Sequence, residues 1–452
     1  MCSKPTRARA AFRWRSFDPR QRAGRIGRGA RMSTASAIEI AAAALFGLAV
    51  LHTFASSLFE RLAHTQPRHA GLWHLLGEVE VVFGVWALAL MLLWAALEGS
   101  APALHYIDNS NFTEPLFVFA IMVVAATRPV LVLAQNAAVG LARRLPLPQG
   151  MALYGVVLML VPLLGSFITE PAAMTLAALL LRDTVLAQPV SNRLKYATLG
   201  VLFVNVSIGG TLTPFAAPPV LMVAGVWGWD MSFMQHHFGW KAALAVAVNA
   251  LGAMLVFRRE LGALPSAPDD TPEGQNMHWV VTGVHMAFLV GVVLFAHHPA
   301  VFMGLLLFFL GYTTAYPRYQ SPLILREALL VAFFLAGLVV LGGLQAWWLK
   351  PILLSLDESQ VFWGVALLTA FTDNAALTYL GSLVPGLSQP FQIALVAGAV
   401  TGGGLTVIAN APNPAGVALL RCRFDDETIA PLGLLLGALP PTLVAALAFR
   451  CL

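Results

Sequence analysis

Charged side chains are scarce in this sequence. Only 11% of its 452 residues are Asp, Glu, Lys or Arg, whereas 58% are hydrophobic, a share above the roughly 45–50% of soluble domains. After the first 31 residues, the longest hydrophilic stretch runs only from about 258 to 277, which leaves no room for a soluble catalytic domain. Apolar runs of about 17–25 residues, enough to span a bilayer, recur along nearly the whole chain. The sequence therefore predicts an all-α polytopic membrane protein.

Cysteine is rarer still, with three residues in the whole sequence. Cys2, Cys422 and Cys451 lie near the chain ends or at a helix terminus, without CxxC spacing, so we expect neither a disulfide framework nor a cysteine metal site. The sequence also has no glycine-rich dinucleotide motif after a strand, no Walker phosphate loop and no nucleophile elbow. The usual signals of ATP-driven transport and of hydrolysis are thus missing, and we expect no organic cofactor and no enzyme activity.

The formal net charge of +5 is no indication of nucleic acid. Nine arginines lie in residues 1–31, and most of the others flank apolar runs, where lipid headgroups and membrane topology explain them. Because Met32 precedes the first apolar run, we interpret residues 1–31 as an Arg-rich extension that is either disordered or not translated.

Apolar windows divide the rest of the chain into full spans and interrupted segments. Full spans are expected near residues 37–59, 74–97, 115–135, 240–257, 278–296, 300–316, 327–347 and 430–449. Residues 151–182 and 360–384 break at polar positions and are expected to be re-entrant helical hairpins. Residues 195–229 and 391–420 contain paired glycines and several prolines, so each is expected to be a broken transmembrane helix.

The distribution of charge predicts how these segments cross the membrane. Cytoplasmic loops accumulate Lys and Arg. The pairs that we place on that side are Arg61 and Arg68, Arg143 and Arg144, Arg258 and Arg259, Arg318 and Arg326, and Arg421 and Arg423, with Glu98, Asp108 and Glu114 among the acids opposite. The first hairpin then enters from the cytoplasm and the second from outside. We predict two inverted repeats, 32–257 and 278–452, joined by a cytoplasmic linker at 258–277, with about ten full crossings.

Each predicted hairpin carries an acid at its break and precedes a similar glycine phrase. Glu170 lies in 166–171 (SFITEP) and precedes 209–213 (GGTLT), while Asp373 lies in 370–374 (AFTDN) and precedes 402–406 (GGGLT). Charge inside a bilayer costs about 2.5–3.5 kcal/mol on insertion scales, and such residues usually mark ion or substrate pathways. Pairing an acid with a broken helix is how secondary transporters build a site near the membrane midplane. Packing of small residues is the alternative explanation for the glycines.

Oxygen ligands suit a hard cation such as sodium, and unwound backbone beside half-helices supplies them. The residues expected to line the ion and substrate site are Thr169, Glu170, Asn205, Gly209, Gly210, Thr211, Thr213, Thr372, Asp373, Asn374, Gly402, Gly403, Gly404, Thr406, Asn410 and Asn413, with sodium held by Glu170, Asp373 and Asn374. Burial favours the protonated form of a carboxyl group and a bound cation favours the ionised form, so proton and sodium would compete. Alternatively, Thr and Asn at such breaks cap half-helices, and each acid caps a helix N-terminus in a vestibule.

Other polar residues have a simpler interpretation. Glu78 and Glu80 fall inside an apolar run, and a position in the headgroup layer at a helix start is favoured over one in the membrane. Glu114, in 112–115 (FTEP), begins a span and is expected to cap its helix. His236, His237, His297 and His298 lie at expected outer helix ends, where interfacial histidines are commoner than metal ligands.

The region from about 37 to 450 resembles the ion transporter superfamily that includes NhaD-type sodium/proton antiporters and arsenite, citrate and dicarboxylate carriers. More narrowly, it is similar to the bacterial family described as putative sodium/proton antiporters. Residues 166–171, 209–219, 371–374 and 402–414 carry the likeness. The resemblance implies that hairpin tips and unwound segments form the sites. Dicarboxylate carriers of this group have a Ser-Asn-Thr phrase at their hairpin tips, whereas the tips here carry acids, which suit a cation.

The leading hypothesis is a secondary active transporter that exchanges sodium for protons across the bacterial inner membrane. One alternative is a sodium- or proton-coupled carrier of a small anion such as arsenite or a carboxylate. A second is an intramembrane aspartyl-type protease using Glu170 and Asp373. The expected partners are the lipid bilayer and a small inorganic cation, a homodimer being left open.

Overall fold

The computed structural model describes residues 35–264 and 277–452, so the Arg-rich extension at 1–31 and most of the linker at 258–277 lie outside the described residues. The residues from Ala37 onward form one compact unit, called the second unit because it follows Ser36. Within the described residues of the second unit the structure is helical and contains no strand, as the sequence predicts.

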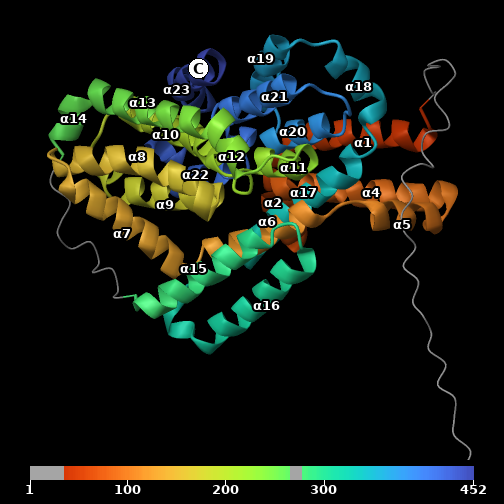
Figure 1. Ribbon diagram of the computed structural model, residues 1–452, viewed down its shortest axis with the longest axis horizontal. Coiled ribbons are helices and arrows are strands. Elements are labelled where there is room, and N and C mark those ends of the chain that lie inside the picture. Colours follow the sequence, from red (N-terminus) through yellow and green to blue (C-terminus); the bar gives the residue numbers. More distant parts are fainter. Residues whose placement is uncertain (1–34, 265–276) are drawn as a thin grey trace, which may run out of the picture. The chain divides into compact units, whose positions relative to one another are not determined.

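The helices follow one another with short connections (Figure 1). Before the linker they are α1 (Ala37–Thr53), α2 (Ser56–Thr65), α3 (Ala70–Gly77), α4 (Val79–Glu98), α5 (Ser100–Asn109), α6 (Thr113–Ala125), α7 (Arg128–Arg144), α8 (Gln149–Ile168), α9 (Glu170–Asp183), α10 (Asn192–Gly209), α11 (Pro218–Trp227), α12 (Met231–Met234), α13 (Trp240–Val256) and α14 (Arg258–Gly262). After it they are α15 (Trp279–Leu294), α16 (Pro299–Ala315), α17 (Leu325–Gly342), α18 (Ala346–Leu354), α19 (Glu358–Thr369), α20 (Asn374–Ser382), α21 (Gln389–Gly402), α22 (Asn413–Leu420) and α23 (Pro431–Cys451).

Among the described residues, five helices are long and apolar enough to cross a membrane. They are Val79–Glu98, Gln149–Ile168, Met231–Val256, Leu325–Gly342 and Pro431–Cys451, and α6 with α7 would make a sixth if that bent pair is one span. The helix Met231–Val256 joins α12 to α13 through one π-helical turn at Gln235–Gly239. Several other segments are built from shorter apolar helices, so the ten crossings stay a prediction.

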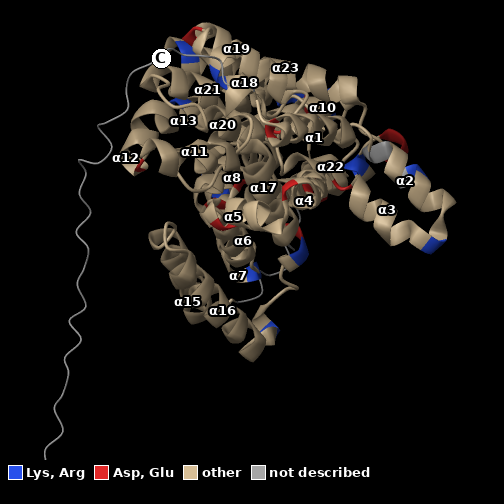
Figure 2. Cartoon of the chain, turned by 90° about the vertical axis from the view of Figure 1, so that its right-hand side faces the viewer, with Lys and Arg blue, Asp and Glu red and all other residues tan. Residues whose placement is uncertain are grey.

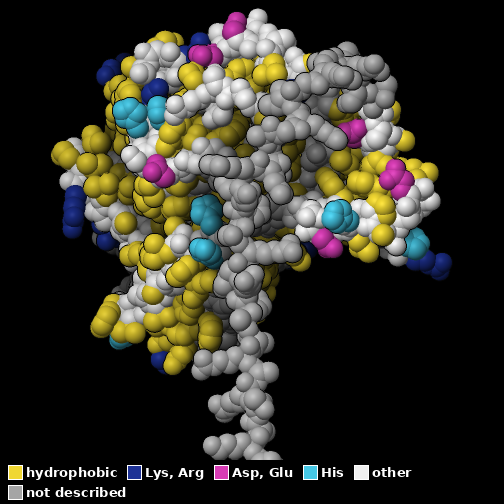
Figure 3. All heavy atoms as spheres, turned by 45° about the vertical axis from the view of Figure 1, so that its right-hand side comes forward, with side chains coloured by type: hydrophobic (Ala, Val, Ile, Leu, Met, Phe, Trp, Pro, Cys, Tyr) yellow, Lys and Arg dark blue, Asp and Glu magenta, His cyan; other side chains and the backbone are white. Residues whose placement is uncertain are grey.

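Several large apolar side chains are exposed on the surface of the protein, which would be unfavourable in water. Leu294, Val256 and Phe308 are 73%, 75% and 76% exposed, and hydrophobic side chains cover much of the face seen in Figure 3. In Figure 2 the blue and red segments that mark charged residues are few among the tan ones. Apolar surface of this extent is typical of contact with lipid, and the chain is a multi-pass membrane protein.

Two expected spans have different boundaries in the structure. The span expected at 37–59 ends at Thr53, and α2 starts at Ser56. The span expected at 115–135 bends by 66° between α6 and α7. Pro129 lies in the first turn of α7 and cannot donate the backbone hydrogen bond that a continuous helix needs. The bend is therefore a consequence of a proline that the hydropathy pattern conceals.

The interrupted segments break where the sequence predicts. One residue, Thr169, separates α8 from α9, and these two helices pack together. Residues 370–373 separate α19 from α20. Residues 213–217 lie between a short 3₁₀ turn after α10 and the start of α11, and α21 and α22 are separated by 403–412, which holds another 3₁₀ turn. Four interruptions thus supply backbone groups that no regular helix satisfies.

Glycines let the two halves of the chain pack closely. The Cα of Gly200 on α10 lies against the backbone of Gly437 on α23, and Gly337 on α17 lies against the backbone of Phe83 on α4. Helix α11 also packs against α20. Small residues permit such approach between membrane helices. Because the halves interlock within one compact unit, the broken segments of both come together, while their inverted orientation remains a prediction.

Candidate functional site

The first hairpin breaks at a strained residue. Thr169 has φ 73° and ψ 151°, a backbone conformation that residues other than glycine rarely adopt. Glu170 begins α9 directly afterwards, and Pro171 follows in the first turn, where its missing N–H is not needed. The surrounding structure must hold Thr169 in this conformation, and such strain is commonly found at functional sites.

Hydrogen bonds join this hairpin to the unwound residues that follow α10, which we name loop 1 (residues 210–217). The Ser166 hydroxyl donates to the carbonyl of Gly209 at 2.7 Å and accepts from the N–H of Leu212 at 2.9 Å. The Thr213 hydroxyl donates to the carbonyl of Ser166 at 2.7 Å. Ser166 and Thr213 therefore satisfy backbone groups that the broken helices leave free.

The second hairpin is tied to the residues after α21 in a similar way. We name this segment loop 2 (residues 403–412). The Thr406 hydroxyl donates to the carbonyl of Ala370 at 2.9 Å, as Thr213 does to Ser166. The Cα of Gly402 lies against the carbonyl of Ala366, and that of Gly209 lies against the carbonyl of Pro162. In each half the two contacted carbonyl groups belong to residues four positions apart, Pro162 and Ser166 in the first and Ala366 and Ala370 in the second. The two hairpin tips are therefore held in the same way.

When the two hairpins are matched by these contacts, the two acids are offset from one another by one residue. Glu170 is the first residue of α9, whereas Asp373 is the residue before α20 and caps it. Asp373 Oδ1 accepts from the N–H groups of Ala375 at 2.8 Å and Ala376 at 3.3 Å. The positional counterpart of Asp373 is therefore Thr169, and that of Glu170 is Asn374. The two acids therefore occupy neighbouring rather than equivalent positions in the two hairpins.

Glu170 lies at the contact between the two halves. Its side chain is fully buried, and Oε2 accepts a hydrogen bond from Asn410 Nδ2 of loop 2 at 2.8 Å. On the other side, the carboxyl group lies directly against the Cα of Gly210 in loop 1, where a Cβ would overlap it. Both loops and the first hairpin thus meet at one carboxyl group.

Asp373 faces the same asparagine across a small cavity. Asp373, Asn410 and Glu80 line a space of ≈ 20 Å³, about the volume that one water or one small ion needs. The charged groups that interact with the acids are themselves acids: Asp373 acts on Glu170, and Glu80 acts on Asp373. When ionised, a cluster of carboxyl groups of this kind attracts cations.

Glu80 is a residue for which the sequence favoured a headgroup position. It lies in the first turn of α4, half-buried, on the wall of the cavity that Asp373 lines. Its neighbour Glu78 forms an ion pair with Arg326 of α17. In the sequence, Glu80 lies inside an apolar run, two residues after Glu78. That position is the signal that could have identified it.

Several buried polar atoms at this junction have no hydrogen-bond partner within the described part of the chain. They are Thr169 Oγ1, Glu170 Oε1, Asn374 Oδ1 and Nδ2, Asn410 Oδ1 and Asn413 Oδ1. Leaving a buried polar group unsatisfied costs about 1–3 kcal/mol, so each indicates a missing partner. All but one of these atoms are oxygens, the ligands that a hard cation binds.

Other residues of the expected site have structural partners. The Asn205 amide donates to the carbonyls of Leu158 at 2.8 Å and Val246 at 3.2 Å, and its oxygen accepts from Asn249 at 2.9 Å. Its hydrogen bonds therefore join α8, α10 and α13 rather than reaching the acids. The Thr211 hydroxyl donates to the carbonyl of Ile208 at 2.7 Å.

The remaining expected residues belong to the loops or the tip. Asn413 Nδ2 donates to the carbonyls of Gly403 at 2.8 Å and Thr406 at 2.9 Å, which holds loop 2 in shape. The Cα of Gly403 lies against the Asn374 amide, and that of Gly404 lies against the backbone of Val204. Thr372 is half-buried beside Asp373.

Two residues near the site were absent from the sequence interpretation. Ser207 on α10 donates to the carbonyl of Val400 on α21 at 2.8 Å, which joins the two broken helices directly. Thr401 is buried with its hydroxyl unpartnered in the described structure. Both are small polar residues inside apolar helices, and neither carries a charge or breaks a helix, so no sequence pattern marks them.

The chemistry of the site is that of oxygen ligands. Among the described residues, no group of three or more His, Cys, Asp or Glu side chains is arranged to hold a metal ion. Transition metals prefer such nitrogen and sulfur ligands, whereas amide, hydroxyl and carboxylate oxygens suit sodium. The arrangement can therefore bind either a small hard cation or protons on its carboxyl groups.

Comparison with known proteins gives one assignment. No curated protein matches the chain. A family model described as "Putative Na+/H+ antiporter" matches residues 37–452, which include both hairpins and both loops. The wider likeness to NhaD-type antiporters and anion carriers stays a prediction. The match supports transport rather than catalysis, and the chain belongs to this family of sodium/proton antiporters.

Proposed function

We propose that the chain exchanges sodium for protons at one site formed by the two hairpin tips and the two loops. Sodium would be bound by Glu170, Asp373 and the oxygens of Asn374 and Asn410, with the Thr169 hydroxyl within the same junction. Family membership supports sodium/proton antiport in general. The location of the site at these residues is our inference from their burial and their contacts.

The hydrogen bond between Asn410 and Glu170 is the observation that carries the proposal. It joins residues that are 240 positions apart and leaves one oxygen on each side chain without a partner in the described structure. A buried carboxylate needs a counter-ion or a proton. Since the amide nitrogen already donates to Oε2, the Oε1 atom and the amide oxygen are available to a cation.

Competition between proton and sodium for these carboxyl groups is sufficient for exchange. In apolar surroundings a carboxyl group is stable when protonated or when paired with a cation, and its bare ionised form is unfavourable. A site that opens to each side in turn would therefore release one ion only as the other binds. Glu80 on the cavity wall adds a further negative charge that favours cations over anions.

The alternative functions are less compatible with this geometry. Anion carriage would need positive charge at the tips, whereas the charges acting on Glu170 and Asp373 are carboxylates. An aspartyl protease needs two carboxyl groups that share a proton. Within the described residues Glu170 bonds to Asn410 and Asp373 bonds to the start of α20, with no bond between them.

Transport in inverted membrane vesicles from cells producing the protein tests this proposal. In vesicles with an acid interior, added sodium should dissipate the pH gradient, and Glu170→Gln or Asp373→Asn should abolish that response. Asp108→Asn, which removes an exposed acid on α5, is the matched control and should respond like the wild type. A response to arsenite or citrate in place of sodium would overturn the assignment, as would full activity in both acid variants.

We further propose a bacterial inner-membrane location, no organic cofactor, and sodium, protons and lipid as the partners of the chain. A homodimer is compatible with the exposed apolar surface.

A further inference from the structure

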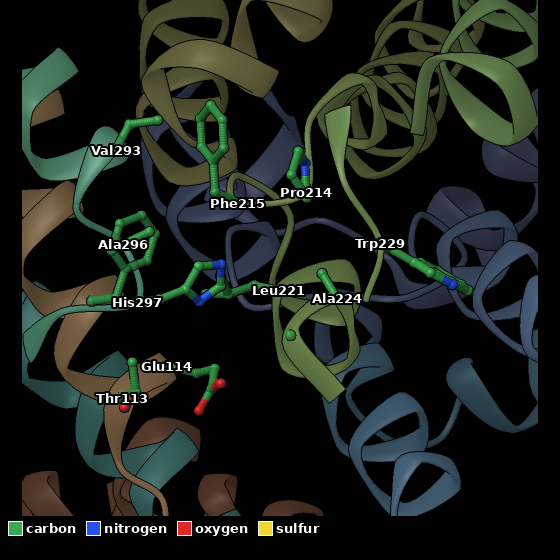
Figure 4. A pocket seen from close by; sticks show the side chains of 12 residues that line it. Thr113, Glu114, Pro214, Phe215, Leu221, Ala224, Trp229, Val293, Ala296 and His297 are labelled. Atoms are coloured by element: carbon green, nitrogen blue, oxygen red, sulfur yellow. The ribbon is translucent and has the colours of Figure 1, made fainter. Parts of the chain in front are cut away.

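Loop 1 also lines a second cavity. It has a volume of ≈ 120 Å³ and lies between the start of α6, helix α11, loop 1 and the turn between α15 and α16. Figure 4 shows the Glu114 carboxylate and the His297 imidazole, from two different elements, pointing into the same space. A cavity of this size holds several waters.

Glu114 and His297 converge on one glycine of α11. A Cβ built on Gly225 would lie 3.6 Å from Glu114 Oε1 and 3.8 Å from His297 Cε1. Glu114 is half-buried and His297 is exposed, so the pair marks the passage from the surface inward. The absent side chain at Gly225 leaves the space between them open.

Loop 1 connects this cavity to the proposed ion site. Pro214 and Phe215 line the cavity, whereas Gly210, earlier in the same loop, lies against the Glu170 carboxyl group. Between them, Thr213 ties the loop to the first hairpin through Ser166. Loop 1 therefore contacts the cavity at one end and the Glu170 carboxyl group at the other.

The surroundings of Glu114 are otherwise nearly free of charge. His297 and the phenol of Tyr379 on α20 are the titratable groups that interact with it in the described structure, and Asn111 donates to its Oε1 at 3.4 Å. Asp230, just after Trp229 of the cavity wall, instead accepts from Phe233 at the start of α12. Residues 213–217 of loop 1 carry no titratable side chain.

We propose that Glu114 and His297 form a sodium-admitting mouth whose affinity for the cation falls when His297 takes up a proton. With a neutral imidazole the mouth carries the negative charge of Glu114 and attracts sodium. With a protonated imidazole the two charges compensate, and sodium is no longer concentrated there. Proton uptake by an imidazole is reversible, so the mouth responds to pH on its own side of the membrane. This inference rests on the proposed function.

Removal of the carboxylate provides the first test. Glu114→Gln should raise the apparent KM for sodium about tenfold at pH 7.5, because a negatively charged cleft concentrates a cation by at least that factor, and leave the maximal rate within about twofold. Initial rates of ²²Na⁺ flux are measured in right-side-out and in inverted vesicles, and the rise should occur in only one orientation. Asp108→Asn is the control, and an unchanged KM in both orientations would overturn the proposal.

Removal of the imidazole provides the second test. In the wild type the KM for sodium should rise as the pH on the Glu114 side falls from 7.5 to 6. His297→Gln should make that rise smaller and keep the low KM of pH 7.5. The adjacent His298 does not line the cavity, so His298→Gln should retain the wild-type pH dependence. Equal pH dependence in both histidine variants would contradict a role for His297.

The third test fills the space between Glu114 and His297 with a larger side chain at Gly225. Gly225→Leu should slow sodium flux by about tenfold or more, since its side chain would occupy the space between the two groups, whereas Gly140→Leu, where nothing lies within 4 Å, should not. Failure of the proposed function would show as active Glu170→Gln and Asp373→Asn variants. Failure of this inference alone would show as inactive acid variants with wild-type behaviour of Glu114→Gln, His297→Gln and Gly225→Leu.

Discussion

The Asn410 amide donates a hydrogen bond to the Glu170 carboxylate at 2.8 Å and thereby connects loop 2 to the first hairpin. Asn410 also lines the cavity that holds Asp373. One asparagine therefore touches the environment of both acids, and the oxygens of Asn410 and Glu170 that remain without a partner in the described structure lie at the same junction. The proposed sodium site depends on this residue as much as on the carboxyl groups.

Replacing Asn410 should weaken sodium binding. Asn410→Ala removes the donor to Glu170 and a candidate cation ligand, and an unsatisfied buried group costs about 1–3 kcal/mol. We expect the KM for sodium to rise by about tenfold to a hundredfold, measured from sodium-dependent dissipation of a pH gradient in vesicles.

A matched control exists on the surface. Asn192 also donates to an acid far along the chain, Asp425, at 2.6 Å, but this pair is exposed. Asn192→Ala should leave the KM within about twofold, because exposed polar pairs contribute little. If both asparagine variants behave alike, the Asn410–Glu170 bond has no special role in binding.

Adding one methyl group to loop 1 should displace Glu170. A Cβ on Gly210 would overlap the Glu170 carboxyl group, and overpacking of a close contact costs about 1–3 kcal/mol. The φ of Gly210 is −71°, so alanine fits the backbone. Gly210→Ala should lose most sodium transport while still folding, as judged by size-exclusion chromatography in detergent. Gly140→Ala, with no atoms within 4 Å, should remain active, and a fully active Gly210→Ala would contradict this packing.

Replacing Thr169 by glycine should stabilise the protein and weaken its binding of sodium. Its backbone conformation costs about 1–3 kcal/mol for a residue with a side chain, and glycine relieves that strain at an entropic cost of about 0.5–1 kcal/mol. Thr169→Gly should therefore raise the thermal unfolding temperature in detergent and, by removing the unpartnered hydroxyl, raise the KM for sodium. Thr169→Ser keeps the hydroxyl and should keep the wild-type KM. A destabilised Thr169→Gly would show that the strain is absent.

We expect Asn205 to stabilise the fold rather than to bind sodium. Its side chain bonds to Leu158, Val246 and Asn249, so Asn205→Leu should destabilise the protein by about 1–3 kcal/mol through the lost hydrogen bonds. The protein that folds should have an unchanged KM for sodium. Measuring thermal unfolding and KM on the same preparation separates the two effects, and a raised KM without loss of stability would return Asn205 to the ion site.

Local sequence was sufficient to locate the four interruptions. Proline after Glu170, paired glycines at Gly209 and Gly402, and a helix-capping acid at Asp373 each act within one or two turns of backbone. The bend at Ala126–Thr127 has an equally local cause in Pro129, but the apolar pattern runs through it without change. A hydropathy window averages over such a proline, so the sequence interpretation drew one straight span.

The assembly of the site could not be read from the sequence. The contact between Glu170 and Asn410 depends on packing between the two halves, and the position of Glu80 beside Asp373 depends on how α4 lies against α17. The partners of Asn205 on α8 and α13 are likewise tertiary contacts, which the nearby glycine motif does not indicate. Residue type indicated which atoms could bind a cation, and tertiary contacts indicate which of them are still without a partner.

The most direct measurement is the number of protons released when sodium binds to the purified protein in detergent, followed with a pH-sensitive dye in weakly buffered solution. If the carboxyl groups of Glu170 and Asp373 bind either ion, the wild type should release protons on addition of sodium. Glu170→Gln and Asp373→Asn should then release fewer or none, while Asp108→Asn should release as many as the wild type. Sodium binding without proton release in the wild type, or equal release in all four proteins, would contradict competition at these acids.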